Sequence, residues 1–170
     1  MTDQEQNEIL ENWLAGYKAL IFKIIRSYAF TAMDREDLFQ EISLQVWRSI
    51  PSFRGECAVT TWLYRISLNT AIRFSQRERK RSAQRTSLDD SYHVLLQSES
   101  HHDDRLEWLY TEISKLDEID RSITLLMLDD FSYKEMASII GITESNIGVH
   151  INRIKKQLIE KSKKYDHYGL

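Results

Sequence analysis

The stretch TTWLYRISLN, residues 60–69, combines groups that can trap an unpaired nucleic-acid base. Trp62 supplies an aromatic ring, while Asn69 and Arg73 add an amide and a cation near the same helix face. Gly55, in the preceding loop PSFRGECAV, permits unusual backbone angles. Base–aromatic stacking is worth about 1–3 kcal/mol. The structural alternative makes Trp62 a core residue and Asn69 a satisfied buried amide, and this helix alone favours that alternative.

A second group of informative residues lies in FSYKEMASIIGITESNIGVHINRIKKQL. Ser132 and Glu135 predict a capping box that starts a short helix. Gly141 predicts a tight turn, and Ala137, four residues before it, allows two helices to approach closely. Ile147, six residues after the glycine, would hold the second helix onto the first. This spacing is typical of a helix-turn-helix.

The second helix of this pair, for which Thr143 is the expected cap, has an apolar stripe and a polar face. The residues of the polar face and its flanks are Ser145, Asn146, Val149, His150, Asn152, Arg153 and Lys156. Amides and guanidinium groups suit base edges, lysine suits phosphate, and valine suits a thymine methyl group. We therefore predict a DNA-reading helix. The alternatives are a helical hairpin with an ordinary polar surface and, for His150, a surface histidine without a role.

The rest of the chain predicts an all-α fold made of two small helical domains, the C-terminal one a helix-turn-helix. Five glycines and one proline among 170 residues favour long helices. Apolar spacing predicts one helix over residues 10–28, a second over 35–50 that is capped by Asp34 and closed by Pro51, and a third from about Thr61. Residues 82–104 are polar and acidic and predict a flexible linker. The expected domains are therefore residues 1–81 and 105–170.

Composition excludes several classes of protein. A net charge of −3 is unlike an autonomous nucleic-acid binder, although residues 73–85 and 153–164 are locally basic. The single cysteine, Cys57, excludes a disulfide framework. It is expected to pack as a small apolar side chain, and the alternative is a redox sensor. His101 and His102 are expected to be solvated, and we predict no metal and no cofactor. No apolar run approaches the roughly 20 residues of a membrane span, which predicts a cytoplasmic protein without membrane insertion.

Two blocks of the sequence resemble bacterial RNA polymerase sigma factors, most closely the small extracytoplasmic-function (ECF) type. DREDLFQEISLQVWRSIPSFRGECAVTTWLYRISLNTAIRF resembles their second conserved region. LDEIDRSITLLMLDDFSYKEMASIIGITESNIGVHINRIKKQL is similar to their fourth region. The resemblance covers residues 8–162 and implies a subunit that binds core RNA polymerase and directs promoter recognition, strand opening and transcription initiation. Such a subunit is not an enzyme.

The resemblance also implies roles for single residues. The residues expected to dock on the clamp helices of the largest polymerase subunit are Asp37, Gln40, Glu41 and Trp47. In such factors the minus-ten element is recognised and melted, and one base is flipped into a pocket. The residues that the resemblance assigns to this role are Arg54, Thr61, Trp62, Arg65, Asn69 and Arg73, and Arg77 extends this basic series. The terminal helix reads the minus-thirty-five element while its domain sits on the flap of the second large subunit. His150 departs from the arginine common in the family, and an anti-sigma partner is left open.

The linker length is consistent with this interpretation. Residues 82–104 span at most about 80 Å when extended and average about 25 Å as a coil, whereas promoter elements two helical turns apart need roughly 70 Å. Polymerase would therefore have to hold the two domains apart and make two weak contacts bivalent. The alternative is a stand-alone helix-turn-helix regulator, which would bind a palindromic duplex tightly by itself. The N-terminal block shows no ligand pocket or dimerisation heptads for such a regulator, and no catalytic motif for an enzyme.

Overall fold

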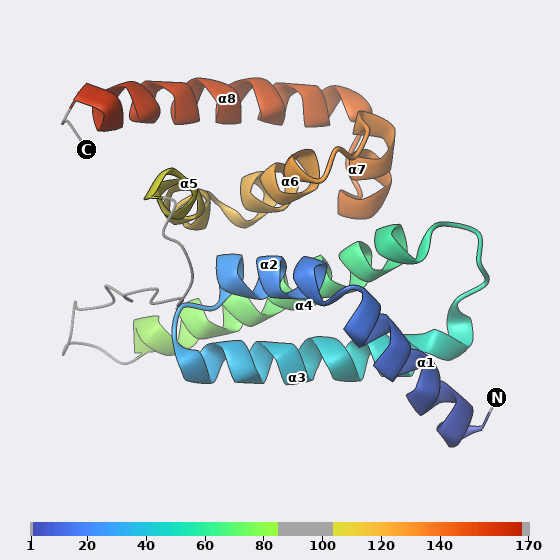
Figure 1. Cartoon of the computed structure of the whole chain (residues 1–170). Coiled ribbons are helices and arrows are strands. Elements are labelled where there is room, and N and C mark those ends of the chain that lie inside the picture. Colours follow the sequence, from blue (N-terminus) through green and yellow to red (C-terminus); the bar gives the residue numbers. More distant parts are fainter. Residues whose placement is uncertain (1, 85–103, 168–170) are drawn as a thin grey trace. The chain divides into compact units, whose positions relative to one another are not determined.

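The computed structural model describes residues 2–84 and 104–167, and every regular element within them is a helix, which confirms the predicted all-α class. One compact unit contains α1 (Asp3–Gly16), α2 (Lys18–Tyr28), α3 (Ala32–Ser49), the 3₁₀ turn η1 (Ile50–Ser52) and α4 (Val59–Gln84). The other contains α5 (Asp104–Ser114), α6 (Glu118–Leu128), α7 (Tyr133–Ile140) and α8 (Glu144–His167) (Figure 1). None of the helices in the described ranges has the length and apolarity that crossing a bilayer requires.

The first expected helix is in fact two helices, so the prediction of one helix over residues 10–28 is wrong. The chain leaves helical geometry at Tyr17, where φ is −115° and ψ is 23°. Gly16, a poor helix former, directly precedes this break. The break lets α1 and α2 take different directions, so that α1 packs on α3 and η1 and α2 packs on α3 and α4. The buried face of α2, with Ile21, Ile24 and Ile25, packs into the core of the unit.

The start of α3 also differs from the prediction, because Thr31 and not Asp34 is the N-cap. Thr31 has extended backbone angles, and its Oγ1 accepts a hydrogen bond from the Asp34 N–H at 3.0 Å. A threonine hydroxyl in this position satisfies one of the amides left open at a helix start. Asp34 instead lies in the first turn, where its charge suits the helix dipole. Pro51 lies in η1 immediately after α3, which confirms that the helix closes before it.

Helices α2, α3 and α4 form the core of the first unit, with α3 and α4 packed along each other (Figure 1). The buried apolar side chains of α3 and α4 are Leu38, Ile42, Val46, Leu63, Tyr64, Leu68, Ala71 and Phe74. Each full burial of a large apolar side chain contributes about 1.5–3 kcal/mol. On the opposite face of α4, Arg65, Asn69 and Arg73 are exposed to solvent. The loop between η1 and α4 extends beyond the end of this helix pair (Figure 1).

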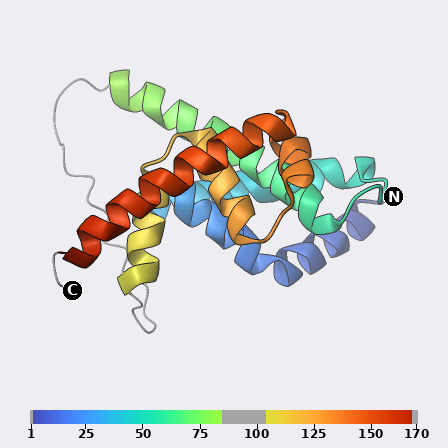
Figure 2. The ribbon, with the colours of Figure 1, turned by 90° about the horizontal axis from the view of Figure 1, so that it is seen from above.

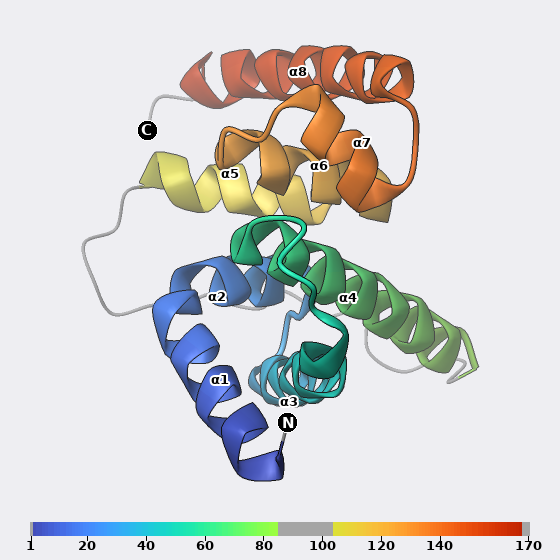
Figure 3. The ribbon, with the colours of Figure 1, turned by 90° about the vertical axis from the view of Figure 1, so that its right-hand side faces the viewer.

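The second unit contains the predicted helix-turn-helix, formed by α7 and α8. Ser132 and Glu135 make the capping box, and Gly141 ends α7 in the left-handed conformation with φ of 85°. Thr143 Oγ1 accepts from the Asn146 N–H at 3.2 Å at the start of α8, as predicted. The apolar stripe of α8 is buried against α6 and α7, including Ile147. Within this unit α8 lies along one side of the other three helices (Figures 2 and 3).

The predicted linker falls mostly outside the described residues. Helix α4 includes residues 82–84, and α5 begins at Asp104. His101 and His102 lie between the two described ranges, so the expectation for them stays a prediction.

Candidate functional site

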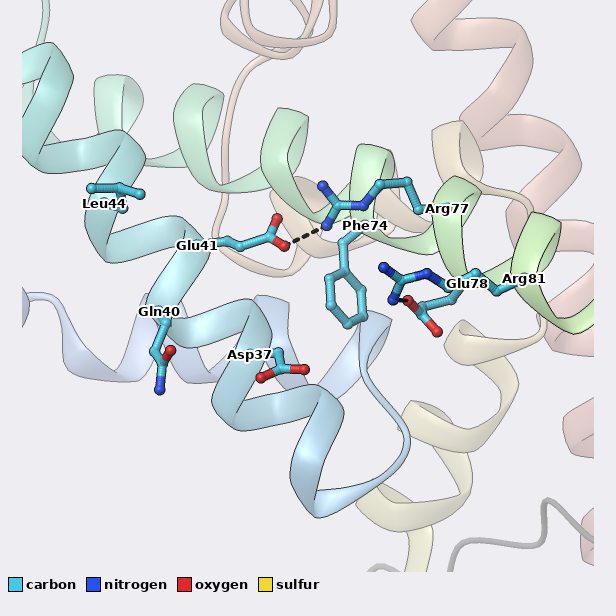
Figure 4. Close-up of a pocket in the computed structure, with 8 residues that line it drawn as sticks. All are labelled: Asp37, Gln40, Glu41, Leu44, Phe74, Arg77, Glu78 and Arg81. Atoms are coloured by element: carbon cyan, nitrogen blue, oxygen red, sulfur yellow. Dashed lines mark hydrogen bonds and ion pairs between the residues drawn. The ribbon is translucent and has the colours of Figure 1, made fainter.

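A groove of about 430 Å³ lies between α3 and α4 (Figure 4). Its lining residues are Asp37, Gln40, Glu41 and Leu44 from α3 and Phe74, Arg77, Glu78 and Arg81 from α4. Glu41 forms an ion pair with Arg77 across the groove. Leu44 is 45% exposed, so an apolar contact stands beside these charges. Apolar surface rimmed by charged and amide groups is suited to binding another protein.

Three of the four residues predicted to dock on polymerase lie in this α3–α4 groove, and Trp47 does not. The Trp47 indole Nε1 donates to Asn7 Oδ1 at 2.8 Å, and its carbonyl oxygen accepts from Gln6 Nε2 at 2.5 Å. Trp47 thus joins α3 to α1. The Glu41–Arg77 pair joins two predicted sets, one for polymerase and one for DNA. No sequence pattern indicates this pair, because the partners are 36 residues apart.

Trp62 belongs to an aromatic cluster that it forms with Trp13 and Phe53. Its ring centroid lies 5.3 Å from that of Trp13 and 5.2 Å from that of Phe53, and the Trp13–Phe53 distance is 5.3 Å. Trp62 is half-buried, so part of its ring remains accessible. Asn69 is exposed, which makes the buried-amide alternative for that residue wrong. The structure therefore gives Trp62 a packing role and leaves the amide of Asn69 on the surface.

The outer face of α4 carries most of the residues predicted to contact the minus-ten element. Arg65, Asn69 and Arg73 are exposed at four-residue intervals, and Thr61 is half-buried at the start of the same series. Residues four apart in a helix are neighbours on its surface. Arg77 continues the series but turns toward Glu41, as described above. The result is a continuous polar and basic strip along one helix.

The loop before α4 is exposed from Arg54 to Ala58. Gly55 adopts φ of 71°, the left-handed conformation that favours glycine, as its position suggested. Cys57 is exposed as a free thiol. The prediction that Cys57 packs as a small apolar side chain is therefore wrong, because the loop stands off the core. Arg54 remains available at the surface beside the start of the α4 strip.

The predicted DNA-reading helix presents a well-defined outer face. The exposed residues of this α8 reading face are Ser145, Asn146, Val149, Asn152, Arg153 and Lys156. Val149 is 63% exposed, so its methyl groups are accessible on this face. His150 is half-buried at the edge of this face.

His150 and Arg153 both bind the carboxylate of Asp120, a residue of α6 that sequence reasoning missed. His150 Nδ1 lies 2.5 Å from Asp120 Oδ1, and Arg153 Nη2 donates to Asp120 Oδ2 at 2.6 Å. The hydrogen bond to Asp120 and the charge of that carboxylate raise the pKa of Arg153. His150 is thus a bonded side chain and not a solvated surface histidine. The sequence does not indicate the pairing of Asp120 with His150 and Arg153, because an aspartate is common in the first turn of a helix, where its charge suits the helix dipole.

A second buried carboxylate ties α5 to α8. Glu112 is 8% exposed in its side chain and accepts from Lys115 and Lys161, each at 2.6 Å. Burial alone would raise the pKa of Glu112, but the hydrogen bonds and charges of the two lysines outweigh it and lower the pKa. Glu112 therefore carries a charge at neutral pH and acts in holding the unit together.

Comparison with known protein families finds two matches that follow each other along the chain. The model for Sigma-70 region 2 matches residues 14–81, and the model for Sigma-70 region 4 matches residues 106–158. The chain is 29% identical over 140 residues to the ECF RNA polymerase sigma-E factor of Haemophilus influenzae, covering 75% of this chain and 74% of the relative. It is 25% identical over 154 residues to the RNA polymerase sigma-H factor of Pseudomonas aeruginosa, covering 84% and 80%.

Solved structures show the same fold. The sigma factor RpoE from Bartonella quintana, solved in complex with the anti-sigma factor NepR, matches with a TM-score of 0.67 and 25% identity, over 92% of this chain and 97% of that one. CnrH, solved in complex with the cytosolic domain of CnrY, matches with a TM-score of 0.66 and 17% identity, over 93% and 90%. The second likeness concerns the fold alone.

Proposed function

Because the chain belongs to the sigma-70 family and is an alternative sigma factor that directs promoter-specific transcription initiation, we propose that its two helical units divide the contacts with core RNA polymerase and promoter DNA. The order of region 2 and region 4 in one chain carries this proposal. Sigma factors serve as initiation factors, and the chemistry of RNA synthesis belongs to polymerase. We take residues 1–81 and 105–170 as the two functional domains and residues 82–104 as the linker between them.

The α3–α4 groove is the proposed docking surface for the clamp helices of the largest polymerase subunit. Asp37 and Gln40 are exposed there, and the carboxylate of Glu41 faces the same space. Leu44 adds an accessible apolar contact. Trp47 would act indirectly, because its bonds to α1 fix the far end of α3.

The outer strip of α4 and the loop around Arg54 are the proposed minus-ten surface. Arg65, Asn69 and Arg73 provide cations and an amide along about two helical turns. Trp62 stands where this strip meets the loop, and its half-buried ring can stack on an unpaired base on its open side. The aromatic cluster would hold that ring in place while the base is flipped.

The α8 reading face is the proposed minus-thirty-five surface. A helix-turn-helix places the start of its second helix in the major groove, and Ser145, Asn146 and Val149 lie in that part of α8. Asn152 and Lys156 extend the contact toward phosphates. The domain itself would sit on the flap of the second large polymerase subunit, and the whole protein would act in the cytoplasm.

An anti-sigma factor is a further proposed partner. RpoE of Bartonella quintana was solved with its anti-sigma factor, and the present chain shares its fold over nearly the whole length. A protein of this kind would compete with polymerase for the same groove.

Transcription in vitro tests the proposal directly. Purified protein and core polymerase are incubated with a library of genomic fragments, and the start sites are mapped. We expect start sites preceded by one shared pair of minus-ten and minus-thirty-five motifs, and none with core polymerase alone. Selective starts that do not depend on the added protein would refute the function. Tight binding of the isolated protein to one palindromic duplex would support the stand-alone regulator in its place.

A further inference from the structure

We propose that Asp120 is a positioning residue for minus-thirty-five recognition, one that orients two DNA-facing side chains of α8 without touching DNA itself. The inference rests on the proposed function of α8. It adds Asp120 of α6 to the residues that serve DNA recognition, and it gives the His150 ring a fixed orientation toward DNA.

Both oxygens of the buried Asp120 carboxylate have partners on α8. The Asp120 side chain is only 4% exposed, and a buried carboxylate needs charge and hydrogen-bond compensation. Its two oxygens receive it from separate residues, Oδ1 from His150 and Oδ2 from Arg153. Asp117 Oδ2 is also 3.6 Å from the same guanidinium nitrogen, but the Asp117 side chain is 57% exposed. Asp120 is therefore the buried anchor and Asp117 an exposed neighbour.

This arrangement fixes which atoms remain for DNA. A carboxylate paired with a guanidinium is ionised and can only accept hydrogen bonds, so the bonded Nδ1 of His150 must carry the hydrogen. That leaves Nε2 of His150 as the outer nitrogen. Within the described part of the chain, all the polar contacts of Arg153 run through Nη2. The Nε and Nη1 groups keep three N–H donors.

Both side chains reach solvent from this anchor. The His150 side chain is 23% exposed and the Arg153 side chain 48% exposed, and residues three apart are neighbours on a helix surface. A guanidinium held at one nitrogen loses less freedom when it binds a base than a free one does. Because Asp120 offsets its charge, Arg153 should also contribute little general attraction for phosphate. We therefore expect these two side chains to discriminate bases more than they add affinity.

A comparison of Asp120→Asn with Asp117→Asn tests the role. Both changes remove one carboxylate charge near Arg153 from the same end of α6, and asparagine preserves the N-cap that Asp117 provides to that helix. Holoenzyme reconstituted from the full chain and core polymerase is given promoters randomised at the minus-thirty-five element. For Asp120→Asn we expect discrimination at one or two adjacent positions to fall about tenfold, with the minus-ten preference unchanged. Asp117→Asn should match the wild type.

Three variants of the two α8 partners keep the test independent of how well Asp120→Asn folds. Arg153→Gln should relax the same positions with an unchanged salt dependence of promoter binding. His150→Asn can still donate to Asp120 but lacks the outer nitrogen, so it should relax one of those positions, whereas His150→Gln should restore part of the preference.

The outcomes separate the two proposals. One outcome is that the wild-type holoenzyme is selective while the Asp120→Asn form loses transcription equally on every minus-thirty-five sequence. Asp120 would then only stabilise the domain, and the positioning role would be overturned. The positioning role is also overturned if Arg153→Gln and His150→Asn leave every base preference intact. A wild-type holoenzyme without any promoter selectivity would instead refute the proposed function.

Discussion

Replacing Trp62 by alanine should affect both stability and strand opening, and the structure gives the size of the first effect. Trp62 contacts two rings, those of Trp13 and Phe53, and each aromatic pair is worth about 0.5–1.5 kcal/mol beyond area burial. Removing a fully buried tryptophan costs about 3–5 kcal/mol, and a half-buried one roughly half of that. The free energy of unfolding should therefore fall by about 2.5–5.5 kcal/mol.

Trp13→Ala is the matched control, because it removes an indole from the same aromatic cluster. Trp13 also contacts two rings, but it lies on α1, outside the proposed DNA surface. Urea unfolding of the full chain, followed by circular dichroism, measures the stability of both variants. Permanganate footprinting of the minus-ten element with holoenzyme then measures strand opening at a temperature where both variants are folded. We expect similar losses of stability, but a much larger loss of permanganate reactivity for Trp62→Ala, with closed complexes still formed.

Two results would contradict this reasoning in different ways. Equal footprints for the two variants would show that Trp62 supports the loop by packing and does not meet a base. A loss below about 1 kcal/mol in both variants would show that the cluster contributes less than its ring contacts imply.

Three further predictions concern the groove, a buried carboxylate and two glycines. Reversing the charges of Asp37 and Glu41 to lysine should weaken binding to core polymerase in a pull-down, and an unchanged affinity would remove them from the interface. Because the pKa of Glu112 is lowered by folding, its stabilisation is present above about pH 4.3 and is lost as the pH falls through the lower folded value, so Glu112→Gln should flatten the acid limb of stability measured by urea unfolding at several pH values. Gly141→Ala should lower the free energy of unfolding by about 1–2 kcal/mol, because the φ of Gly141 is 85°. Gly148→Ala should raise it by up to about 1 kcal/mol, because the new methyl group would meet the Tyr133 side chain at an ordinary 3.6 Å. Thermal unfolding of the two variants measures both changes.

The features that sequence reasoning predicted well are those decided by residues close together in the chain. The capping box at Ser132 and the left-handed turn at Gly141 each depend on a few consecutive residues. The buried stripe of α8 follows from helical periodicity alone. The break at Tyr17 escaped because apolar spacing continues through it, and only the packing of α1 against α3 requires a change of direction.

The interactions that sequence reasoning missed join residues distant in the chain. Asp120 and His150 are 30 residues apart, and Glu41 and Arg77 are 36 apart. No periodicity relates such positions, and each residue has an ordinary local explanation at a helix start or on a polar face. The resemblance to sigma factors supplied the roles of single residues, but it could not supply the contacts that hold them.

Arg77 and Arg153 are both paired with carboxylates, but the two pairs differ in how easily they can be separated when DNA binds. Arg77 and Glu41 are 49% and 37% exposed, and an exposed pair contributes about 0–1 kcal/mol, so the proposed docking of polymerase at Glu41 would release Arg77 at little cost. Asp120 is buried, so separating it from Arg153 would leave an uncompensated charge in the protein. Arg153 must therefore approach DNA with its carboxylate still attached. The net charge is −3, and several cations, Arg77 and Arg153 among them, are paired with carboxylates of the chain itself, so its general attraction for DNA is low. On the proposed function, we therefore expect selectivity to come from the two units bound together on polymerase.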